Sequence, residues 1–247
     1  MALADYRTAL VTGASSGIGE AVVKALTARG IKVTAAARRK DRLDALAKET
    51  GCETLSLDVR DTKAIYDTLG ATPFDILVNN AGSGRGMESL FTASPEDIDT
   101  TAETNVTAVL HMLRAVVPGM VARKTGHVVN IGSVAGLYPM NSTVYGASKG
   151  AVHLMGQNLK LEVKGSGVRV TEICPGRVMT EFFGKAFDSE DKARKFATGF
   201  ELLQPTDIAD AIVYALDAPW RVTVSTIEIV PNEQAVGGST ITPVERG

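Results

Sequence analysis

Tyr145 and Lys149 are separated by four positions in a segment whose apolar spacing predicts a helix at residues 144–163. Residues at this spacing share one helix face, with Cβ atoms about 5 to 6 Å apart. A free tyrosine has a pKa of about 10 and is a poor base at neutral pH. A nearby ammonium favours the phenolate and lowers that pKa by roughly 1 to 3. The pair could therefore exchange a proton with a reacting oxygen, although this spacing is also common on ordinary helices.

Two further polar residues could act with this pair. Ser133 follows a predicted strand at residues 127–131, from where its hydroxyl can hydrogen-bond the same reacting oxygen as the phenol. Asn105 lies inside a predicted long helix at residues 95–120, where asparagine is unfavourable for helix stability. The alternatives are an ordinary loop serine and an asparagine that faces solvent.

The hydrophobic pattern predicts the framework that must position these side chains. Short β-branched runs predict seven strands, at residues 8–12, 31–35, 53–57, 76–79, 127–131, 168–173 and 226–230. Helical spacing predicts helices at residues 18–29, 43–48, 62–69, 95–120, 144–163 and 207–215, with Gly30 as a left-handed cap after the first. Strands joined by helical crossovers form a parallel sheet covered on both faces. The 247 residues therefore predict a single doubly wound α/β domain with a seven-stranded parallel sheet.

The composition excludes several classes of protein. The chain is 45% hydrophobic and 22% charged, as soluble globular domains are, and its net charge of −2 offers no electrostatic footprint for nucleic acid or an anionic membrane. No apolar run approaches the roughly 18 residues that a membrane span needs. Cys52 and Cys174 form no CxxC motif and the N-terminal residues do not resemble a signal peptide, so we expect a cytoplasmic protein with reduced thiols. The three histidines, His111, His127 and His153, lack ligand spacing, and no catalytic metal is expected.

A glycine-rich turn, residues 12–19, follows the first strand and opens the first helix. Gly13, Gly17 and Gly19 omit Cβ atoms where the backbone must turn tightly, approach a pyrophosphate and pack on the sheet. The helix N-terminus offers unpaired N–H groups to the anion. This context predicts a dinucleotide site, rather than only a tight turn. The other predicted contacts in this turn are Ser15, Ser16 and Ile18.

The end of the second predicted strand indicates which dinucleotide binds. Enzymes that use NAD usually place an acidic residue there on the ribose 2′-hydroxyl. This sequence has no acidic residue there before Asp41, and it has arginines at positions 38 and 39. A guanidinium can form a bidentate, charge-assisted pair with a 2′-phosphate. We therefore predict NADP(H), with Arg38 and Arg39 as the phosphate clamp; a solvated basic loop is the alternative.

The spacing Gly-x3-Gly-x-Gly resembles the single-domain form of the short-chain dehydrogenase/reductase family. The resemblance covers nearly the whole chain and includes, in the family's order, Leu57-Asp58-Val59, Asn79-Asn80-Ala81-Gly82, Asn105, Ser133, Tyr145-x3-Lys149 and Pro175-Gly176. It implies a Rossmann fold and hydride transfer between the nicotinamide and a small alcohol or carbonyl substrate. The catalytic residues that it implies are Asn105, Ser133, Tyr145 and Lys149. Family members are usually homotetramers or homodimers, which implies that the helices at residues 95–120 and 144–163 form the interfaces.

The resemblance also implies further cofactor contacts. The matching positions are Asp58, Val59, Asn80, Ala81, Gly82, Pro175, Gly176, Val178 and Thr180, besides Tyr145 and Lys149. The first two match contacts to adenine, the next three match the turn across which the cofactor lies, and the next four match the loop that supports the nicotinamide. Glycine, proline and asparagine after strands are also ordinary turn residues. In the family, the residue at position 105 holds a water that links the lysine to solvent.

The sequence says less about the substrate. Residues 219–231 and 84–88 look more like those of NADP-dependent dehydrogenases of serine and related 3-hydroxy acids than like those of 3-oxoacyl thioester reductases. We therefore expect a small polar hydroxy compound. Arg85 and Arg177 lie on loops expected to border the pocket and could bind a substrate carboxylate, or they are ordinary surface arginines. The other hypotheses are a reductase of neutral ketones or aldehydes, and an NADP-binding regulator without turnover.

Two segments do not fit the alternation of strands and helices. Residues 177–204 are charged and rich in phenylalanine, so they form either a mobile lid over the ligand or a packing insertion. Residues 232–247 show no buried pattern, so we expect this tail either to cross to a neighbouring subunit or to fray. No members of the four-residue catalytic set fall in either segment.

Overall fold

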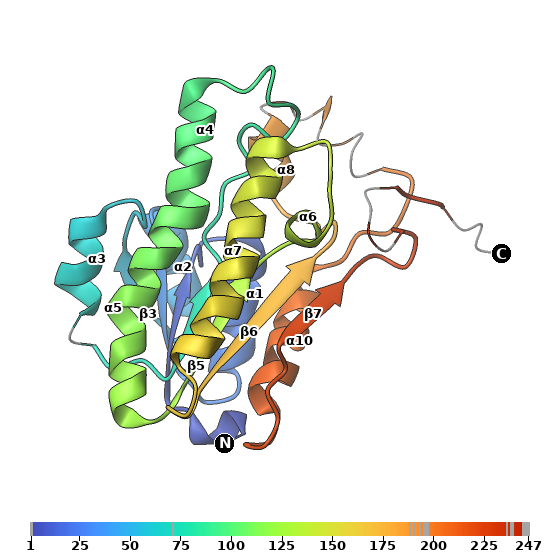
Figure 1. Cartoon of the computed structure of the whole chain (residues 1–247). Helices are drawn as coiled ribbons and strands as arrows, with labels where there is room; N and C mark the ends of the chain where they lie inside the picture. Colours follow the sequence, from blue (N-terminus) through green and yellow to red (C-terminus); the bar gives the residue numbers. More distant parts are fainter. Residues whose placement is uncertain are drawn as a thin grey trace.

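The computed structural model describes residues 2–70, 72–187, 189, 191–192, 194, 198–235, 237 and 240–243. Its seven strands are all parallel and lie in the order β3-β2-β1-β4-β5-β6-β7 (Figure 1). Their bounds are β1 (Thr8–Thr12), β2 (Lys32–Ala37), β3 (Glu53–Ser56), β4 (Ile76–Asn79), β5 (Gly126–Ile131), β6 (Val168–Pro175) and β7 (Thr226–Ile229). The predicted fold class, a doubly wound Rossmann domain, is confirmed.

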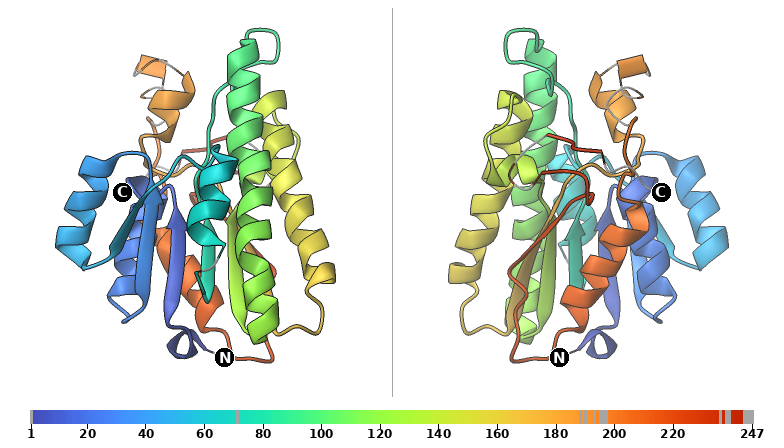
Figure 2. Two further views of the ribbon diagram at one scale, coloured as in Figure 1. Left: turned by 90° about the vertical axis from the view of Figure 1, so that its left-hand side faces the viewer. Right: turned by 90° about the vertical axis from the view of Figure 1, so that its right-hand side faces the viewer.

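Helices cover both faces of this sheet (Figure 2). Those that share one core with the sheet are α1 (Gly17–Thr27), α2 (Lys40–Thr50) and α10 (Pro205–Asp217). The opposite face is covered by α3 (Thr62–Leu69), α5 (Ala108–Arg123) and α7 (Thr143–Glu162). Three shorter helices, α4 (Pro95–Ala102), α6 (Val134–Leu137) and α8 (Phe182–Phe187), lie near the carboxyl ends of the strands.

Side chains of each central strand alternate between the two cores. In β1, Ala9 and Val11 join the core under α1 and α10, whereas Leu10 joins the core under α3 and α5. In β4, Ile76 and Leu77 divide in the same way. A strand buried on both faces reads as a continuous apolar run, which is why the sequence pattern located these strands.

The strand order places a crevice at one edge of the sheet. β1 pairs with β2 on one side and with β4 on the other, so the chain winds away from β1 in opposite directions. At such a switch point the connections leave a crevice outside the carboxyl ends of the strands. Gly13, Arg38, Asn80 and Ser133 all follow carboxyl ends of strands and therefore meet at this edge.

The helix predicted at residues 95–120 is not one regular α-helix. A π-helical turn, Glu103–Thr107, lies between α4 and α5 and contains Asn105. A π turn inserts extra backbone into the helix and is frequent at functional sites. The side chain of Asn105 in this turn is buried and is hydrogen-bonded to the N–H of Ser83 and to Ser148 Oγ.

The helical stretch Pro95–Arg123 is long and apolar enough, by length and composition alone, to cross a membrane. Polar and charged residues such as Asn105 and Arg114 interrupt this stretch, so it contains no uninterrupted apolar run of about 18 residues. Residues of α5 such as Met112 and Val116 are buried in the core of the sheet, as in the core helix of a globular domain.

The two segments outside the alternation are partly ordered by contacts with the rest of the chain. Val178 and Leu203 form a parallel bridge that joins the two ends of segment 177–204, and α8 lies between them. Residues 188, 190, 193 and 195–197 lie outside the described residues, and the hypothesis of a mobile lid stays a prediction. In the tail, Glu233 and Gln234 are buried although the sequence shows no buried pattern there, and the expectation that the tail crosses to a neighbouring subunit or frays stays a prediction. Residues 236, 238–239 and 244–247 lie outside the described residues.

Candidate active site

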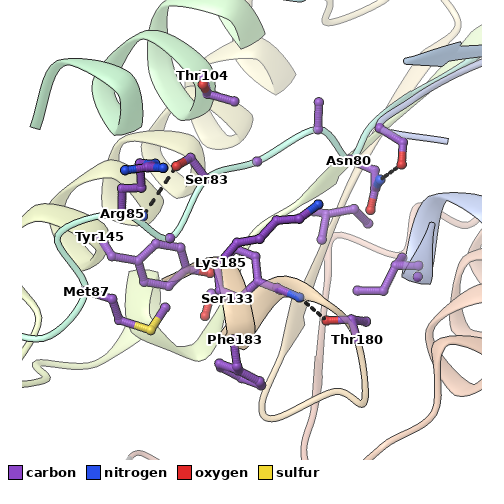
Figure 3. Close-up of a pocket in the computed structure, with 18 of the residues that line it drawn as sticks. Asn80, Ser83, Arg85, Met87, Thr104, Ser133, Tyr145, Thr180, Phe183 and Lys185 are labelled. Carbon is purple, nitrogen blue, oxygen red and sulfur yellow. Dashed lines mark hydrogen bonds between the residues drawn. The ribbon is translucent and has the colours of Figure 1, made fainter. Parts of the chain in front are cut away.

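The carboxyl ends of the strands border a cavity of about 800 Å³ (Figure 3). Every predicted site residue lines it except Gly19 and Asn105. Those that line it are Gly13, Ser15, Ser16, Gly17, Ile18, Arg38, Arg39, Asp58, Val59, Asn80, Ala81, Gly82, Arg85, Ser133, Tyr145, Lys149, Pro175, Gly176, Arg177, Val178 and Thr180. The structure therefore brings motifs that lie far apart in the sequence together around one cavity. The roles of these residues in ligand binding stay predictions.

The glycine turn is fixed against the end of β4. Gly13 has φ +65°, and a Cβ built on it would lie 2.8 Å from Asn80 Nδ2 and 2.9 Å from Ala81 Cα. The amide of Asn80 donates to the carbonyl oxygens of Thr12 (2.9 Å) and Gly13 (3.3 Å). A Cβ on Gly19 would lie 2.5 Å from the carbonyl oxygen of Gly13, so Gly19 acts by close packing behind the turn. The absence of side chains here is a geometric requirement of the turn.

The turn has the form of an anion cradle. Gly17 also has positive φ, and Ser16 caps α1 with an extended backbone and no side-chain bond to the first turn. The N–H groups at the start of a helix lack intrahelical acceptors, and the helix dipole favours negative charge there. The cradle residues therefore fit the pyrophosphate of a dinucleotide.

Basic side chains gather at the end of the cavity near β2. The guanidinium of Arg39 donates to the hydroxyl oxygens of Ser15 (2.9 Å) and Ser16 (2.6 Å). Arg38 is exposed and lies 3.9 Å from a carboxylate oxygen of Asp58. Arg39 therefore lies beside the glycine turn and Arg38 lies beside Asp58. Their role as a clamp for a 2′-phosphate stays a prediction.

Arg60 is a residue of this region that sequence reasoning missed. Its guanidinium donates to the carboxylate of Asp58 at 2.8 Å, and this hydrogen bond is the main reason that the pKa of Asp58 is lowered. Arg60 also lines the cavity. Its position two residues after the family motif at Asp58 is the only signal that could have found it.

The structure brings Tyr145, Ser133 and Lys149 together on one wall of the cavity. The phenol of Tyr145 shares a hydrogen bond with Ser133, whose Oγ also accepts from the backbone N–H of Ala135 at 3.1 Å. Lys149 Nζ donates to the carbonyl oxygen of Ile131 at 2.8 Å and lies 5.8 Å from the centre of the Tyr145 ring. All three side chains are less than 10% exposed. This arrangement can hold one oxygen atom of a substrate between a hydroxyl and a phenol.

Burial changes the acid–base properties of this pair. It raises the pKa of Tyr145 to about 12, an effect that the Ser133 hydrogen bond opposes. Burial also lowers the pKa of Lys149 to about 8. The expectation that Lys149 lowers the tyrosine pKa below 10 is therefore wrong for the protein by itself, because removal from water penalises the phenolate more strongly. In this state the phenol is a proton donor.

Asn105 lies behind the cavity wall. Its Nδ2 donates to the carbonyl oxygen of Ser83 (2.8 Å) and to Ser148 Oγ (2.9 Å), and its Oδ1 accepts from the N–H of Ser83 (2.7 Å). A Cβ on Gly82 would lie 3.4 Å from Asn105 Oδ1 and 3.9 Å from Lys149 Nζ, so the glycine leaves open the space between them. Asn105 fixes the loop at Ser83, and the predicted water relay to Lys149 stays a prediction.

Arg85 and Arg177 line the same cavity as Tyr145. Arg85 Nη1 lies 3.0 Å from a carboxylate oxygen of Asp97, and the Arg177 guanidinium lies 5.3 Å from the centre of the Phe200 ring. Burial lowers the pKa of Arg177. Both arginines therefore line the cavity and each contacts another side chain, and their role toward a substrate stays a prediction.

Other lining residues include phenylalanines of segment 177–204 and residues that the sequence did not mark. The ring of Phe182 lies 5.6 Å from that of Tyr145, and a Cβ on Gly84 would lie 2.6 Å from Phe182 Cζ. Gln234 Oε1 accepts from the N–H of Arg177 at 3.1 Å, so the tail reaches the cavity of its own chain. The remaining lining residues of this kind include Met87, Glu181 and Phe183. The phenylalanine-rich composition was a signal for Phe182, whereas nothing in the sequence marked Gln234.

Within the described ranges, no group of three or more histidine, cysteine or acidic side chains could hold a metal ion. The three histidines contact separate partners, which are Tyr66 for His111, Thr171 for His127 and Glu172 for His153. Cys52 and Cys174 are buried free thiols.

Comparison with known proteins places the chain among dehydrogenases. A sequence model of the family described as short chain dehydrogenase matches residues 7–191. The NADP-dependent 3-hydroxy acid dehydrogenase YdfG of Escherichia coli (strain K12) is 41% identical over 239 residues, which cover 93% of this chain and 96% of that protein. A probable NADP-dependent dehydrogenase of Haemophilus influenzae is 36% identical over 244 residues, which cover 95% of this chain and 97% of that protein.

Solved structures show the same similarity. The closed form of a serine dehydrogenase complexed with NADP⁺ superposes with a TM-score of 0.90 and 40% identity, covering 97% of this chain and all of that one. The serine dehydrogenase of Escherichia coli gives a TM-score of 0.77 and 38% identity, covering 90% of this chain and 96% of that one.

Gly13→Ala tests the cradle, with Gly30→Ala as its matched control. Both glycines have positive φ, and a Cβ there costs alanine about 1 to 2 kcal/mol of stability. Only at position 13 would the Cβ also displace Asn80 and Ala81; nothing lies within 4 Å of the Cβ at position 30. We expect G13A to lower dinucleotide affinity about tenfold or more, equivalent to about 1.4 kcal/mol, and G30A to leave it unchanged. Calorimetric titration measures this, and equal affinities for the two variants would contradict the assignment.

Proposed function

The chain belongs to the short-chain dehydrogenase family and is an NADP-dependent, alcohol-type dehydrogenase, and we propose that its substrate is a small 3-hydroxy acid such as serine. The observation that carries the proposal is the presence of two arginines, Arg85 and Arg177, in the same cavity as Tyr145. A guanidinium can bind a carboxylate through charge-assisted hydrogen bonds. The similar proteins include a 3-hydroxy acid dehydrogenase and serine dehydrogenases, which supports the same class of substrate.

In the proposed reaction, the hydroxyl of the substrate lies between Ser133 and Tyr145. Bound NADP⁺ supplies the hydride acceptor and a positive charge in the cavity. Ser133 holds the reacting oxygen, and ionised Tyr145 accepts its proton during oxidation; the protonated phenol returns it during reduction. Lys149, held by the carbonyl of Ile131, contributes positive charge 5.8 Å from the centre of the Tyr145 ring.

The proposed cofactor contacts divide along the cavity. The glycine turn with Ser15, Ser16 and Ile18 would hold the pyrophosphate, and Arg38 with Arg39 would hold the 2′-phosphate. The proposed contacts to the rest of the cofactor are Asp58 and Val59 at the adenine, Asn80, Ala81 and Gly82 along the sheet, and Pro175, Gly176, Val178 and Thr180 at the nicotinamide. All of these predicted contacts except Gly19 line one cavity, which supports the assignment.

A second candidate is reduction of a neutral ketone or aldehyde. Phe182, Phe183 and Met87 add apolar surface to the cavity near Tyr145, which favours an uncharged substrate. The two candidates share the same proton and hydride chemistry. They differ in whether Arg85 and Arg177 contribute to substrate affinity.

We also propose that the protein acts in the cytoplasm as a homotetramer or homodimer. Exposed apolar side chains on the α4–α5 stretch and on α7 support this assembly, because large apolar side chains at a surface favour contact with another chain. These side chains are Ile98, Leu110, Val121, Leu154 and Leu161.

Tyr145→Phe tests the proposed proton transfer. Removal of the phenolic oxygen should lower kcat by about 10² to 10⁴, while the dissociation constant for NADPH changes little. Tyr138→Phe is the matched control: it also removes a phenolic hydrogen bond, to Glu228 at 2.8 Å, but Tyr138 does not line the cavity. Steady-state rates and NADPH fluorescence titrations provide both readouts. A near-wild-type rate for Y145F would end the proposal.

Arg85→Ala and Arg177→Ala test recognition of a carboxylate. Loss of a hydrogen bond to a charged group costs about 1.5 to 3 kcal/mol, so at least one variant should raise KM for serine or another 3-hydroxy acid about tenfold or more. KM for a neutral alcohol should stay constant. Arg29→Ala serves as the control, because Arg29 is an exposed arginine outside the cavity. An unchanged KM for the hydroxy acid in both variants would exclude this role and favour the neutral substrate.

A further inference from the structure

Glu181 joins two arginines at the adenosine end of the cavity. Its carboxylate accepts hydrogen bonds from Arg39 Nη1 at 2.9 Å and from Arg42 Nη1 at 2.5 Å. Lys185 Nζ, one turn further along α8, lies 3.4 Å from the same carboxylate. The chain therefore places its own anion between guanidinium groups that come from a segment about 140 residues earlier.

These guanidinium groups include one that is already assigned to the cofactor. Arg39 contacts Ser15 and Ser16 of the glycine turn and Glu181 at the same time. The hydrogen bonds from Arg42 and Arg39 lower the pKa of Glu181 to about 2, so its carboxylate is charged at neutral pH. An anionic group of the cofactor that approaches Arg39 must therefore either displace this carboxylate or bind beside it.

We propose that Glu181 is a specificity-determining residue whose carboxylate competes with the 2′-phosphate of NADP(H) for Arg39 and Arg42. This inference rests on the proposed position of the phosphate clamp. A 2′-phosphate carries up to two negative charges and three acceptor oxygens, and it can replace a carboxylate on two guanidinium groups. A ribose 2′-hydroxyl is neutral and cannot, so NAD(H) leaves the internal ion pairs in place. In this account Arg42 is a further phosphate ligand, reached once Glu181 has moved.

The same residue links the phosphate clamp to the catalytic tyrosine. Glu181 directly precedes Phe182, whose ring packs 5.6 Å from the Tyr145 ring. The ion pairs of Glu181 therefore hold the start of α8, and Phe182 and Ala186 pack against Gly84. Exchange of the carboxylate for a phosphate releases the first of these attachments, so binding of the 2′-phosphate changes how firmly α8 is held over Tyr145.

The test compares binding of two cofactor fragments, adenosine 2′,5′-bisphosphate and adenosine 5′-monophosphate, by calorimetric titration. Removal of the competing charge by Glu181→Gln should tighten binding of the bisphosphate about threefold to tenfold, as expected for one partly exposed charge pair. Arg42→Gln should weaken binding of the bisphosphate. Neither variant should change the affinity for the monophosphate.

Asp44→Asn is the matched control. Asp44 lies on α2 beside Arg42 and pairs with Lys40 at 2.8 Å, so this variant removes one carboxylate from the same helix without touching Arg39 or Arg42. It should leave both affinities unchanged. If D44N also binds the bisphosphate more tightly, the effect is one of general electrostatics and the proposal is overturned. The proposal is also overturned if E181Q binds the bisphosphate with unchanged or lower affinity.

The result for the wild-type protein separates this proposal from that of the clamp itself. If wild type binds the bisphosphate no more tightly than the monophosphate, the assignment of Arg38 and Arg39 fails, and the competition fails with it. If wild type prefers the bisphosphate and E181Q does not increase that preference, only the competition fails. Hydrogen exchange of α8 gives an independent readout. The backbone amides of Phe182–Phe187 should exchange faster in E181Q than in wild type and D44N. Equal exchange rates would contradict the claim that the ion pairs of Glu181 hold α8.

Discussion

The account depends on the burial of a phenol and an amine in the same cavity wall. Removal from water disfavours the charged form of each, which raises the pKa of Tyr145 to about 12 and lowers that of Lys149 to about 8. The protein alone therefore holds the phenol protonated. A positive charge near the phenol counters the cost of burial, so binding of an oxidised cofactor and ionisation of the tyrosine are coupled.

The rest of the fold positions Tyr145 and Lys149 and brings the glycine turn to the same cavity. Parallel strands end at one edge of the sheet, so motifs that lie far apart in the sequence meet there. The amide of Asn80 fixes the glycine turn beside β4, and the π turn at Asn105 fixes the loop at Ser83. The carbonyl of Ile131, at the end of β5, orients Lys149. The strand order brings the residues that make these contacts to the same edge of the sheet.

Much of the fold could be predicted because buried parallel strands read as short continuous apolar runs, whereas amphipathic helices repeat their apolar residues every three to four positions. All seven strands were located, and Gly30 has the expected left-handed backbone. Several helix ends were misplaced because caps and polar first turns lie outside the apolar pattern: α10 begins at Pro205, two residues before the predicted start. The π turn was missed because one extra residue hardly changes a helical pattern over 26 positions.

The site was predictable where chemistry follows a local motif, and not where it depends on contacts between distant segments. The cavity brought together the glycine turn, Ser133, Tyr145 and Lys149 as their spacing suggested. No local pattern could show that Glu181 meets Arg39, 142 positions earlier, or that Gln234 returns to the cavity. The direction of the tyrosine pKa was also missed, because sequence spacing indicates which charges are near and says nothing of how completely water is excluded.

Ultraviolet difference titration of the phenol, wild type minus Y145F, tests the central claim most directly. The account predicts that Tyr145 ionises near pH 12 in the protein alone and at a distinctly lower pH when NADP⁺ is bound. A pKa at or below 10 in the protein alone, or one that does not change with NADP⁺, would contradict the coupling between burial, cofactor charge and proton transfer.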